Sequence, residues 1–420
     1  MGIARNIELR HVLEKLELWL APDDANDLRT RRGLGLNNIL FMAAELLLLS
    51  GEPEQSLALL LIEEPEAHLH PQLQARLIEF LEKRSEKAGP AKKDEPLIDA
   101  APPGATNDTA HQSSGQVQVL LTTHSPHFAS KVDLERLIVV SGRRCHPLVR
   151  DRTKLAPADY EFLRRFLDVT KANLFFARGV VIVEGDAENL LLPVLAKKIE
   201  RPFAKHGVSI VNVGSRALFR YARVFQRSEG EGPDVRVACV TDLDLVPDDA
   251  VYAKKNTERE EDEDEKETPS SADRRAALTM GDGGALKTFV SPYWTLEHDL
   301  ARCGLAREVH RAVFIGRKSK NRAKANSAVL TPDERSNAAA KADESFEQLK
   351  TSCGDDAAKL AAAVYEPLYR KQASKAEVAE ILAKILADDL RSADQLRSLL
   401  PAYVVEAIDY VTRKDAEGTA

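Results

Sequence analysis

Four acidic residues follow two short apolar runs at a spacing that suits the binding of divalent cations. Glu184 comes directly after residues 180–183, which read V-V-I-V, and Glu188 follows four positions later. Asp242 and Asp244 come after a second apolar run at residues 235–241. Carboxylates that lie close together repel one another and take up protons unless a cation neutralises them, and Mg²⁺ and Mn²⁺ suit such hard oxygen ligands. The four residues therefore predict an acidic metal site.

The apolar runs predict the elements that bring these acids together. A β-branched run followed by a Glu-Gly-Asp turn and an apolar helical pattern is typical of a buried parallel strand that leads into a helix. If both strands belong to one sheet, their carboxyl ends share an edge, and this is where open α/β sheets bind ligands. A helix that begins near Gly185 would place Glu184 and Glu188 on neighbouring turns of one face.

The motifs V-E-G-D-A-E and T-D-L-D together resemble the Toprim domain of topoisomerases, bacterial primases, recombination-mediator proteins and OLD (overcoming lysogenisation defect) nucleases. Glu184, Asp242 and Asp244 match the family signature, and Glu188 fits its OLD-type version. The resemblance implies two Mg²⁺ or Mn²⁺ ions. Glu184 and Asp242 would hold one ion, and Glu188 and Asp244 would hold the other.

Two further residues are implied by the same resemblance. Residues 287–291 predict the last strand of the sheet, and Glu297 follows in T-L-E-H-D-L as a plausible fifth metal ligand. An acid at a helix start is also a common partner of the helix dipole, so that simpler role stays open. Lys375 in A-S-K-A-E-V resembles the lysine that begins the closing helix of OLD-type Toprim domains, where its charge stabilises the cleaved phosphate.

The first 150 residues resemble half of an ABC-type ATPase. The aliphatic run 57–62 ends at Glu63 and Glu64 and resembles a Walker B element, in which Glu63 would hold the Mg²⁺ shell and Glu64 would orient water. The run 117–122 leads to His124, which resembles the switch histidine that senses γ-phosphate. A turn with Gly33 and Gly35 before Asn37 would take the place of the signature that contacts nucleotide on the opposing subunit. The resemblance thereby implies a homodimer through this region.

The phosphate-binding loop of such ATPases is missing from the sequence. The motif G-x-x-x-x-G-K-[ST] occurs nowhere in the 420 residues, so a backbone nest with its lysine for the β- and γ-phosphates is not encoded. OLD proteins carry this loop near the N-terminus, and the chain resembles one that begins partway through the ATPase domain. We expect this chain alone neither to bind nor to hydrolyse ATP well unless the missing half is supplied.

A set of basic residues predicts where DNA binds. The spacing i, i+4, i+7 and i+11 places four arginines on one stripe of a helix, and arginine is well suited to DNA phosphates. These are Arg216, Arg220, Arg223 and Arg227. A merely solvated helix face is the alternative. A second basic patch at residues 317–324 lies in an Ala/Ser/Asp-rich stretch that reaches residue 355, and this composition favours a loop.

Composition limits the class of protein. The chain is 44% hydrophobic and 30% charged with a net charge of −7, so any DNA contact must come from local basic faces rather than from overall charge. Four widely spaced cysteines argue against a disulfide framework or a zinc ribbon. We find no secretory leader and no apolar run long enough for a bilayer, and therefore expect a cytoplasmic protein without a membrane partner.

These observations predict an α/β protein in four parts. We expect a partial ABC-type ATPase domain (1–150), a helical linker (151–177), a Toprim core with a Rossmann-like parallel sheet (178–310), and a basic, disordered insertion with C-terminal helices (311–420). The predicted function is metal-dependent DNA endonuclease activity by two-metal phosphodiester hydrolysis. One alternative is an ATP-switched DNA-binding or clamp protein whose Toprim module does not cleave. Another is a primase-like nucleotidyl transferase, for which the sequence has no zinc-binding region.

Overall fold

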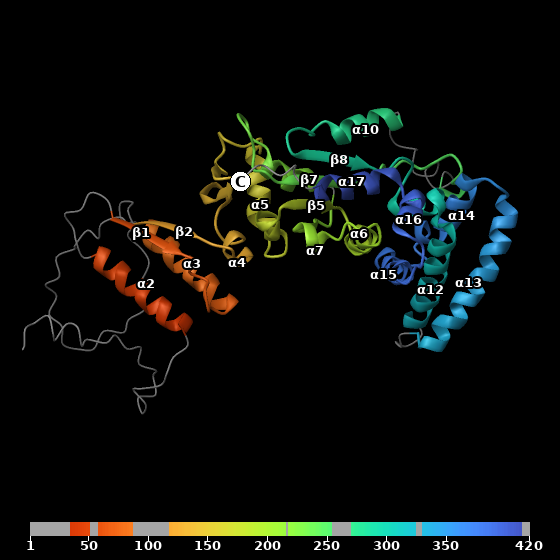
Figure 1. The fold of residues 1–420 in the computed structure, drawn as a ribbon, viewed down its shortest axis with the longest axis horizontal. Coiled ribbons are helices and arrows are strands. Elements are labelled where there is room, and N and C mark those ends of the chain that lie inside the picture. The colour runs from red at the N-terminus through yellow and green to blue at the C-terminus, as the bar shows by residue number, and fades with distance from the viewer. Residues whose placement is uncertain are drawn as a thin grey trace, which may run out of the picture. The chain divides into compact units, whose positions relative to one another are not determined.

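The computed structural model describes residues 34–50, 58–86, 117–215, 217–253, 270–324 and 330–413. The chain divides into two compact units, Met1–Val132 and Asp133–Ala420 (Figure 1). The division falls before residue 150, where the sequence placed the end of the ATPase region. Residues 138–147 belong to the second unit, where β3 (Ile138–Ser141) and β4 (Arg144–Pro147) form an antiparallel hairpin.

The first unit is a pair of parallel strands with helices on one face. Its elements are α2 (Leu34–Ser50), β1 (Ala58–Glu63), α3 (Pro71–Glu86), β2 (Val117–Thr122) and α4 (Pro126–Ala129). Alternate residues of each strand, such as Leu60 and Val119, pack against Leu46 and Ile78 of the helices. The residues between them point to the other face, where Leu61 and Leu120 are exposed.

The second unit is built on a four-stranded parallel sheet. The strands are β5 (Gly179–Val183), β6 (Val208–Asn212), β7 (Arg236–Thr241) and β8 (Leu286–Val290), in the order β6-β5-β7-β8. All residues of β5 are buried, which is expected of a parallel strand covered on both faces. The predicted parallel sheet is therefore confirmed.

Two hydrophobic cores cover the two faces of this sheet. On one face, Val181 and Val183 pack against α6 (Asp186–Lys198) and α17 (Ala402–Thr412). On the other face, Val180 and Ile182 pack against α5 (Pro157–Phe166) and α8 (Leu218–Ala222). The short helix α7 (Phe203–His206) precedes β6, and α10 (Ser271–Thr279) packs against β8. A slip of one residue in a strand would move its side chains to the wrong face, so packing on both faces fixes the register. The fixed register in turn fixes where each strand ends.

The C-terminal part of the second unit is helical. It consists of α11 (Leu296–Leu300), α12 (Ala306–Lys324), α13 (Pro332–Cys353), α14 (Ala357–Tyr369), α15 (Lys375–Ala387), α16 (Ala393–Leu399) and α17. In this group α15 packs against both α6 and α12, and α13 packs against α12 (Figure 1). Among the described helices, none combines the length and the apolar character that crossing a bilayer requires.

The expectation of a loop over residues 317–324 and onward to residue 355 is wrong. Residues up to Lys324 continue α12, and α13 occupies most of the Ala/Ser/Asp-rich stretch. Thr331 begins α13 with a capping box in which it exchanges hydrogen bonds with Glu334. Alanine is the best helix former, and Ala338 and Ala342 are fully buried, so a composition that looked like low complexity specifies a packed helix.

Candidate acidic site at the carboxyl edge of the sheet

Five acids from three segments lie at the carboxyl edge of the sheet. Each follows a strand directly or begins the helix after it, and all five were predicted: Glu184 after β5, Glu188 in the first turn of α6, Asp242 and Asp244 after β7, and Glu297 in the first turn of α11. The predicted cation Lys375 is the first residue of α15. The structure therefore brings together residues that are separated by up to 191 positions in the sequence.

The strand register brings the first two segments into contact. Val183 lies opposite Val240 in the β5–β7 ladder, so Glu184 and Thr241 are neighbours, and the Thr241 hydroxyl donates a hydrogen bond to Glu184 Oε1. Gly185 separates Glu184 from α6. A Cβ atom at Gly185 would lie 3.2 Å from Oε2 of Glu188, so the glycine leaves room for that carboxylate beside the strand end.

The segment after β8 holds the two aspartates. The Leu296 N–H donates to Asp242 Oδ1 at 3.0 Å, and the Asp244 N–H donates to the Trp294 carbonyl at 3.3 Å. Asp244 has φ of 58°, a left-handed conformation that aspartate tolerates better than most residues do. The main chain at residues 294–296 therefore sets the position of both acids.

Asp299 holds this segment in place, and sequence reasoning missed it. It is fully buried and accepts hydrogen bonds from the Trp294 N–H at 3.3 Å and the Tyr293 N–H at 3.4 Å. One of its oxygens also lies 3.0 Å from Nδ1 of the buried His298. The only signal in the sequence is an acid four residues after the N-cap Thr295, which is a common arrangement in any helix.

Glu297 is a buried carboxylate with few partners. It is 1% exposed, and neither of its oxygens accepts a hydrogen bond from the residues that the structure describes. Lys375 Nζ lies 3.5 Å from Glu297 Oε2 and provides a neighbouring positive charge. Burial alone would lower the pKa of Lys375, but the charges of Glu297, Tyr365 and Asp242 raise it, so the ammonium stays protonated.

Burial and mutual repulsion raise the proton affinity of two of these acids, Glu188 and Asp242. Burial and the charge of Glu297 raise the pKa of Glu188 to about 7, with a smaller contribution from Glu184. Burial and the charges of Glu188 and Glu297 raise the pKa of Asp242 well above its usual range. One lysine therefore does not offset the negative charge of the cluster, and a cation would relieve the remaining repulsion.

The donor set fits a divalent metal ion. All five acids offer carboxylate oxygens, which suit Mg²⁺ and Mn²⁺, and the buried oxygens of Glu297 accept no hydrogen bond from the described residues. In the described parts of the chain, however, no group of three His, Cys, Asp or Glu side chains is arranged around one point as a ready coordination sphere. The side chains would therefore have to rotate to hold an ion.

The predicted arginine stripe does not lie on one helix. Helix α8 ends at Ala222, a short 3₁₀ turn follows, and Arg227 lies beyond it in an irregular segment. Arg220 Nε lies 3.5 Å and Arg223 Nη1 lies 3.1 Å from the buried carboxylate of Asp159. The prediction of a single helical stripe is therefore wrong. The spacing of the four arginines could not indicate that two of them pair with Asp159, a buried acid on α5.

The other two arginines of the set differ from these. Arg227 is nine-tenths buried and donates a hydrogen bond to the Pro147 carbonyl at 2.8 Å, so it does not belong to an exposed basic stripe. Arg216 lies outside the described residues.

The residues predicted to form a Walker B element and a switch histidine lie side by side in the first unit. Leu121 pairs with Ile62 in the β1–β2 ladder, and the loops after both strands meet. His124 Nε2 lies 3.6 Å from Glu64 Oε1, and both side chains are exposed. Glu66, which the prediction passed over, joins the loops by accepting hydrogen bonds at 2.7 Å from the Thr123 hydroxyl and the His124 N–H.

The glycine turn of the ATPase-like region differs from the expectation. Gly33 lies outside the described residues, and α2 already begins at Leu34, so Gly35 and Asn37 are helical. A Cβ atom at Gly35 would lie 2.3 Å from the His68 carbonyl oxygen, so the glycine permits close packing rather than a turn. Asn37 is exposed on the first turns of this helix.

The parallel sheet with acids at its carboxyl edge defines an α/β protein of the TOPRIM class, joined to an ATPase-like unit. Residues 175–244 match the family described as overcoming lysogenization defect protein-like, TOPRIM domain, and residues 3–129 match the AAA ATPase domain. The chain thus carries an ATPase domain followed by an OLD-like TOPRIM domain, which confirms the resemblance to OLD proteins.

The matches to other proteins are distant, and the chain spans about a third of the length of the relative GajA. The chain is 23% identical over 226 residues to Endonuclease GajA of Bacillus cereus (strain HuB5-5), and this match covers 52% of this chain and 31% of GajA. The solved C-terminal region of the Burkholderia pseudomallei OLD protein is 23% identical and covers 56% of this chain and 98% of its own, with a TM-score of 0.32. That of the Xanthomonas campestris pv. campestris OLD protein is 22% identical and covers 57% and 94%, with a TM-score of 0.33.

Proposed function

We propose that this chain is a cytoplasmic, metal-dependent DNA endonuclease that nicks or cleaves its substrate by two-metal phosphodiester hydrolysis. The observation that carries the proposal is Glu297, a buried carboxylate without a hydrogen-bond donor among the described residues, beside acids that repel one another. Such an arrangement is costly unless a cation compensates it. The name of the distant relative GajA, an endonuclease, agrees with this reading.

Each acid has a role in the proposal. Glu184 and Asp242 would hold one ion, and Glu188, Asp244 and Glu297 would hold the other. Bound ions of this kind lower the pKa of water and polarise the phosphate. Lys375, whose charge lies at the edge of the cluster, would neutralise the developing charge on the cleaved phosphate. The Leu296 N–H would keep Asp242 aligned throughout.

DNA would reach the acids through contacts elsewhere in the second unit. Arg220 and Arg223 keep partly exposed side chains, so they remain candidates for phosphate contacts while they pair with Asp159. The one carboxylate of Asp159 offsets only one of the two guanidinium charges, which leaves one positive charge for a phosphate. Arg216 belongs to the same proposal from its position in the sequence.

The first unit would contribute nucleotide chemistry only with a partner segment. We propose that Glu63, Glu64 and His124 act on ATP when a chain segment with the phosphate-binding loop is supplied, and that homodimers form through this region. Tight, stoichiometric ATP binding by the isolated chain would overturn this part of the proposal. Light scattering in the presence and absence of DNA would test the dimer.

A plasmid-nicking assay tests the nuclease proposal most directly. Wild-type protein, Glu184→Ala and Asp242→Ala are compared in Mg²⁺, Mn²⁺ and Ca²⁺, with Glu161→Gln as a control because Glu161 is an exposed acid of α5 outside the site. We expect nicking in Mg²⁺ or Mn²⁺ by the wild type and the control, and its loss in both site variants. Nicking that survives both alanine substitutions would place the activity elsewhere or in a contaminant.

One observation favours a second candidate, an ATP-switched DNA-binding protein whose TOPRIM module does not cleave. The acids in the described parts of the chain do not form a ready coordination sphere. In this case the wild type would bind DNA and would leave a plasmid intact in every metal tested. A gel-shift assay carried out beside the nicking assay separates the two functions.

A further inference from the structure

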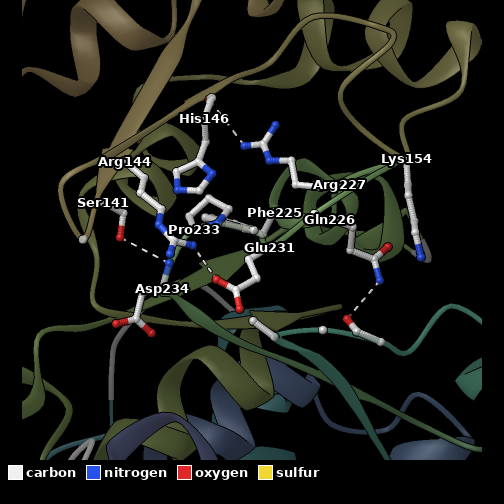
Figure 2. Close-up of a pocket in the computed structure, with 16 residues that line it drawn as sticks. Ser141, Arg144, His146, Lys154, Phe225, Gln226, Arg227, Glu231, Pro233 and Asp234 are labelled. Carbon is white, nitrogen blue, oxygen red and sulfur yellow. Dashed lines mark hydrogen bonds and ion pairs between the residues drawn. The ribbon is translucent and has the colours of Figure 1, made fainter. Parts of the chain in front are cut away.

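A second concave site lies at the opposite, amino edge of the same sheet. It is a cavity of about 680 Å³, and three segments form it (Figure 2). These are the β3–β4 hairpin, the segment 225–234 that leads to β7, and residues 283–285 just before β8. The strands that separate it from the acidic site are five or six residues long, so the two sites are about 15–20 Å apart. They share no residue.

Arg227 gives this cavity a buried positive charge. The residue is 9% exposed, and its guanidinium donates to the carbonyls of Pro147 at 2.8 Å and His146 at 3.4 Å. Nε has no acceptor, and Arg227 has no ion pair with any carboxylate in the part of the chain that the structure describes. A buried guanidinium without a counter-charge is destabilising, and an anion in the cavity would offset it.

The rest of the lining adds cations and one neutral donor. Figure 2 shows Arg144 and His146 to the left, Lys154 to the right, and Arg227 between them. Burial and the charges of Arg227 and Arg144 lower the pKa of His146, so the imidazole is neutral and can donate or accept a hydrogen bond.

Acidic residues of the lining balance these cations only in part. Arg144 pairs with Glu231, and Asp234 is a second carboxylate. Three cations therefore stand against two carboxylates, which leaves one net positive charge. The backbone of the loops leaves open space, because a Cβ atom at Gly230 or Gly284 would meet no atom within 4 Å.

We propose that this cavity binds a phosphate group carried by a small ligand of about the size of a mononucleotide. Cavities of roughly 300–1,000 Å³ hold ligands of this size. Arginine and lysine recognise phosphate through charge-assisted hydrogen bonds, and the excess positive charge selects an anion over a neutral ligand. The phosphate comes either from a free nucleotide or from the phosphorylated end of a nucleic-acid strand, since both present the same group.

Calorimetric titration of the full chain tests this proposal independently of nuclease activity. The titration is done in EDTA, so that the acidic site takes no part, with AMP, inorganic phosphate and a short 5′-phosphorylated oligonucleotide as probes. Unphosphorylated adenosine and oligonucleotide are the matched negative probes. The test variant is Arg144→Ala/Lys154→Ala, because both side chains are exposed and their loss does not uncover core. The control is Arg165→Ala, an exposed arginine outside the cavity.

The outcomes separate the two sources and decide the proposal. We expect phosphorylated probes to bind the wild type and the control equally, and to bind the double variant roughly tenfold or more weakly. Binding of AMP identifies a free nucleotide, and binding of the oligonucleotide alone identifies a strand end. If the wild type does not distinguish phosphorylated from unphosphorylated probes, or if the double variant binds like the wild type, the proposal is wrong.

Discussion

β1 in the first unit and β5 in the second unit are both aliphatic parallel strands that lead to a glutamate. In β5 every residue is buried, since helices cover both faces of the sheet. In β1 the alternate residues Leu59 and Leu61 are 46% and 64% exposed. A continuous aliphatic run is typical of a strand covered on both faces. The sequence of β1 is therefore suited to a second covering layer that the described residues of its unit do not provide.

The acids at the ends of these strands differ in the same way. Glu63 and Glu64 end β1 in an exposed position, where Glu64 lies near His124. At the carboxyl edge of β5 and β7, by contrast, Glu297 of α11 is only 1% exposed and lies beside Lys375 at the start of α15. Similar strand ends thus become either an open surface or a charged, enclosed site, and elements far away in the sequence decide which.

Removing one acid at each place should show the largest difference. We expect Glu297→Gln to lower the nicking rate about 100-fold or more. The variant loses a proposed metal ligand, and with it roughly 3 kcal/mol of transition-state stabilisation. In EDTA the same variant should keep or increase its free energy of unfolding, since a buried charge that repels Glu188 and Asp242 is gone. Plasmid nicking and urea unfolding measure the two effects.

Glu63→Gln is the matched change at the end of β1. It should alter the free energy of unfolding by less than about 0.5 kcal/mol, as exposed substitutions usually do. A Glu297→Gln variant that unfolds more easily without metal would contradict the view that this carboxylate is under electrostatic strain.

Alanine substitutions in β1 and β5 test whether each face of the two strands is covered. Ile182→Ala should lower the free energy of unfolding by about 2–5 kcal/mol, because this β5 side chain is fully buried against α5 and α8. Leu61→Ala should cost less than about 0.5 kcal/mol if the outer face of β1 is open in solution. Urea unfolding, followed by circular dichroism, compares the two. A large cost for Leu61→Ala would mean that another layer covers this face.

Asp299→Asn should produce an intermediate effect that separates positioning from stability. The change weakens the acceptor for the Tyr293 and Trp294 N–H groups, at a cost of about 1–3 kcal/mol. Because this segment holds Asp242 and Asp244, we also expect weaker Mn²⁺ binding by electron paramagnetic resonance.

Asp282→Asn is the control for this change. Asp282 precedes β8, at the end of the strand opposite the acidic site, and accepts hydrogen bonds from Thr288. It should lose stability and keep its Mn²⁺ affinity. Equal loss of Mn²⁺ binding in both variants would remove the positioning role of Asp299.

The sequence was most informative where the position of a residue depends only on the strand that precedes it. Glu184, Asp242 and Asp244 follow buried strands whose apolar runs are unmistakable, and the parallel register then brings the strand ends together. Asp299 and the partner of Arg223 could not be predicted, because their roles depend on which helix packs next to them. Helix α13 was missed for another reason, since an alanine-rich stretch gives little periodicity until a neighbouring helix buries it.

The smallest effect is expected at Asp168, an exposed acid with a lowered pKa, in contrast to the buried acids whose pKa values are raised. Asp168 has a side chain that is 53% exposed. Although burial alone would raise its pKa, hydrogen bonds from Lys171 and Thr170 lower the pKa to about 2. A lowered pKa means that the carboxylate stabilises the fold above the usual value of 3.8 and that this contribution is lost as the pH falls toward 2. Exposure to solvent screens the interaction, so Asp168→Asn should cost less than about 1 kcal/mol at pH 7. The difference in unfolding free energy between wild type and variant should shrink steadily as the pH falls from about 4 to about 2. A difference that stays constant over this range would show that the hydrogen bonds, not the charge, stabilise this turn.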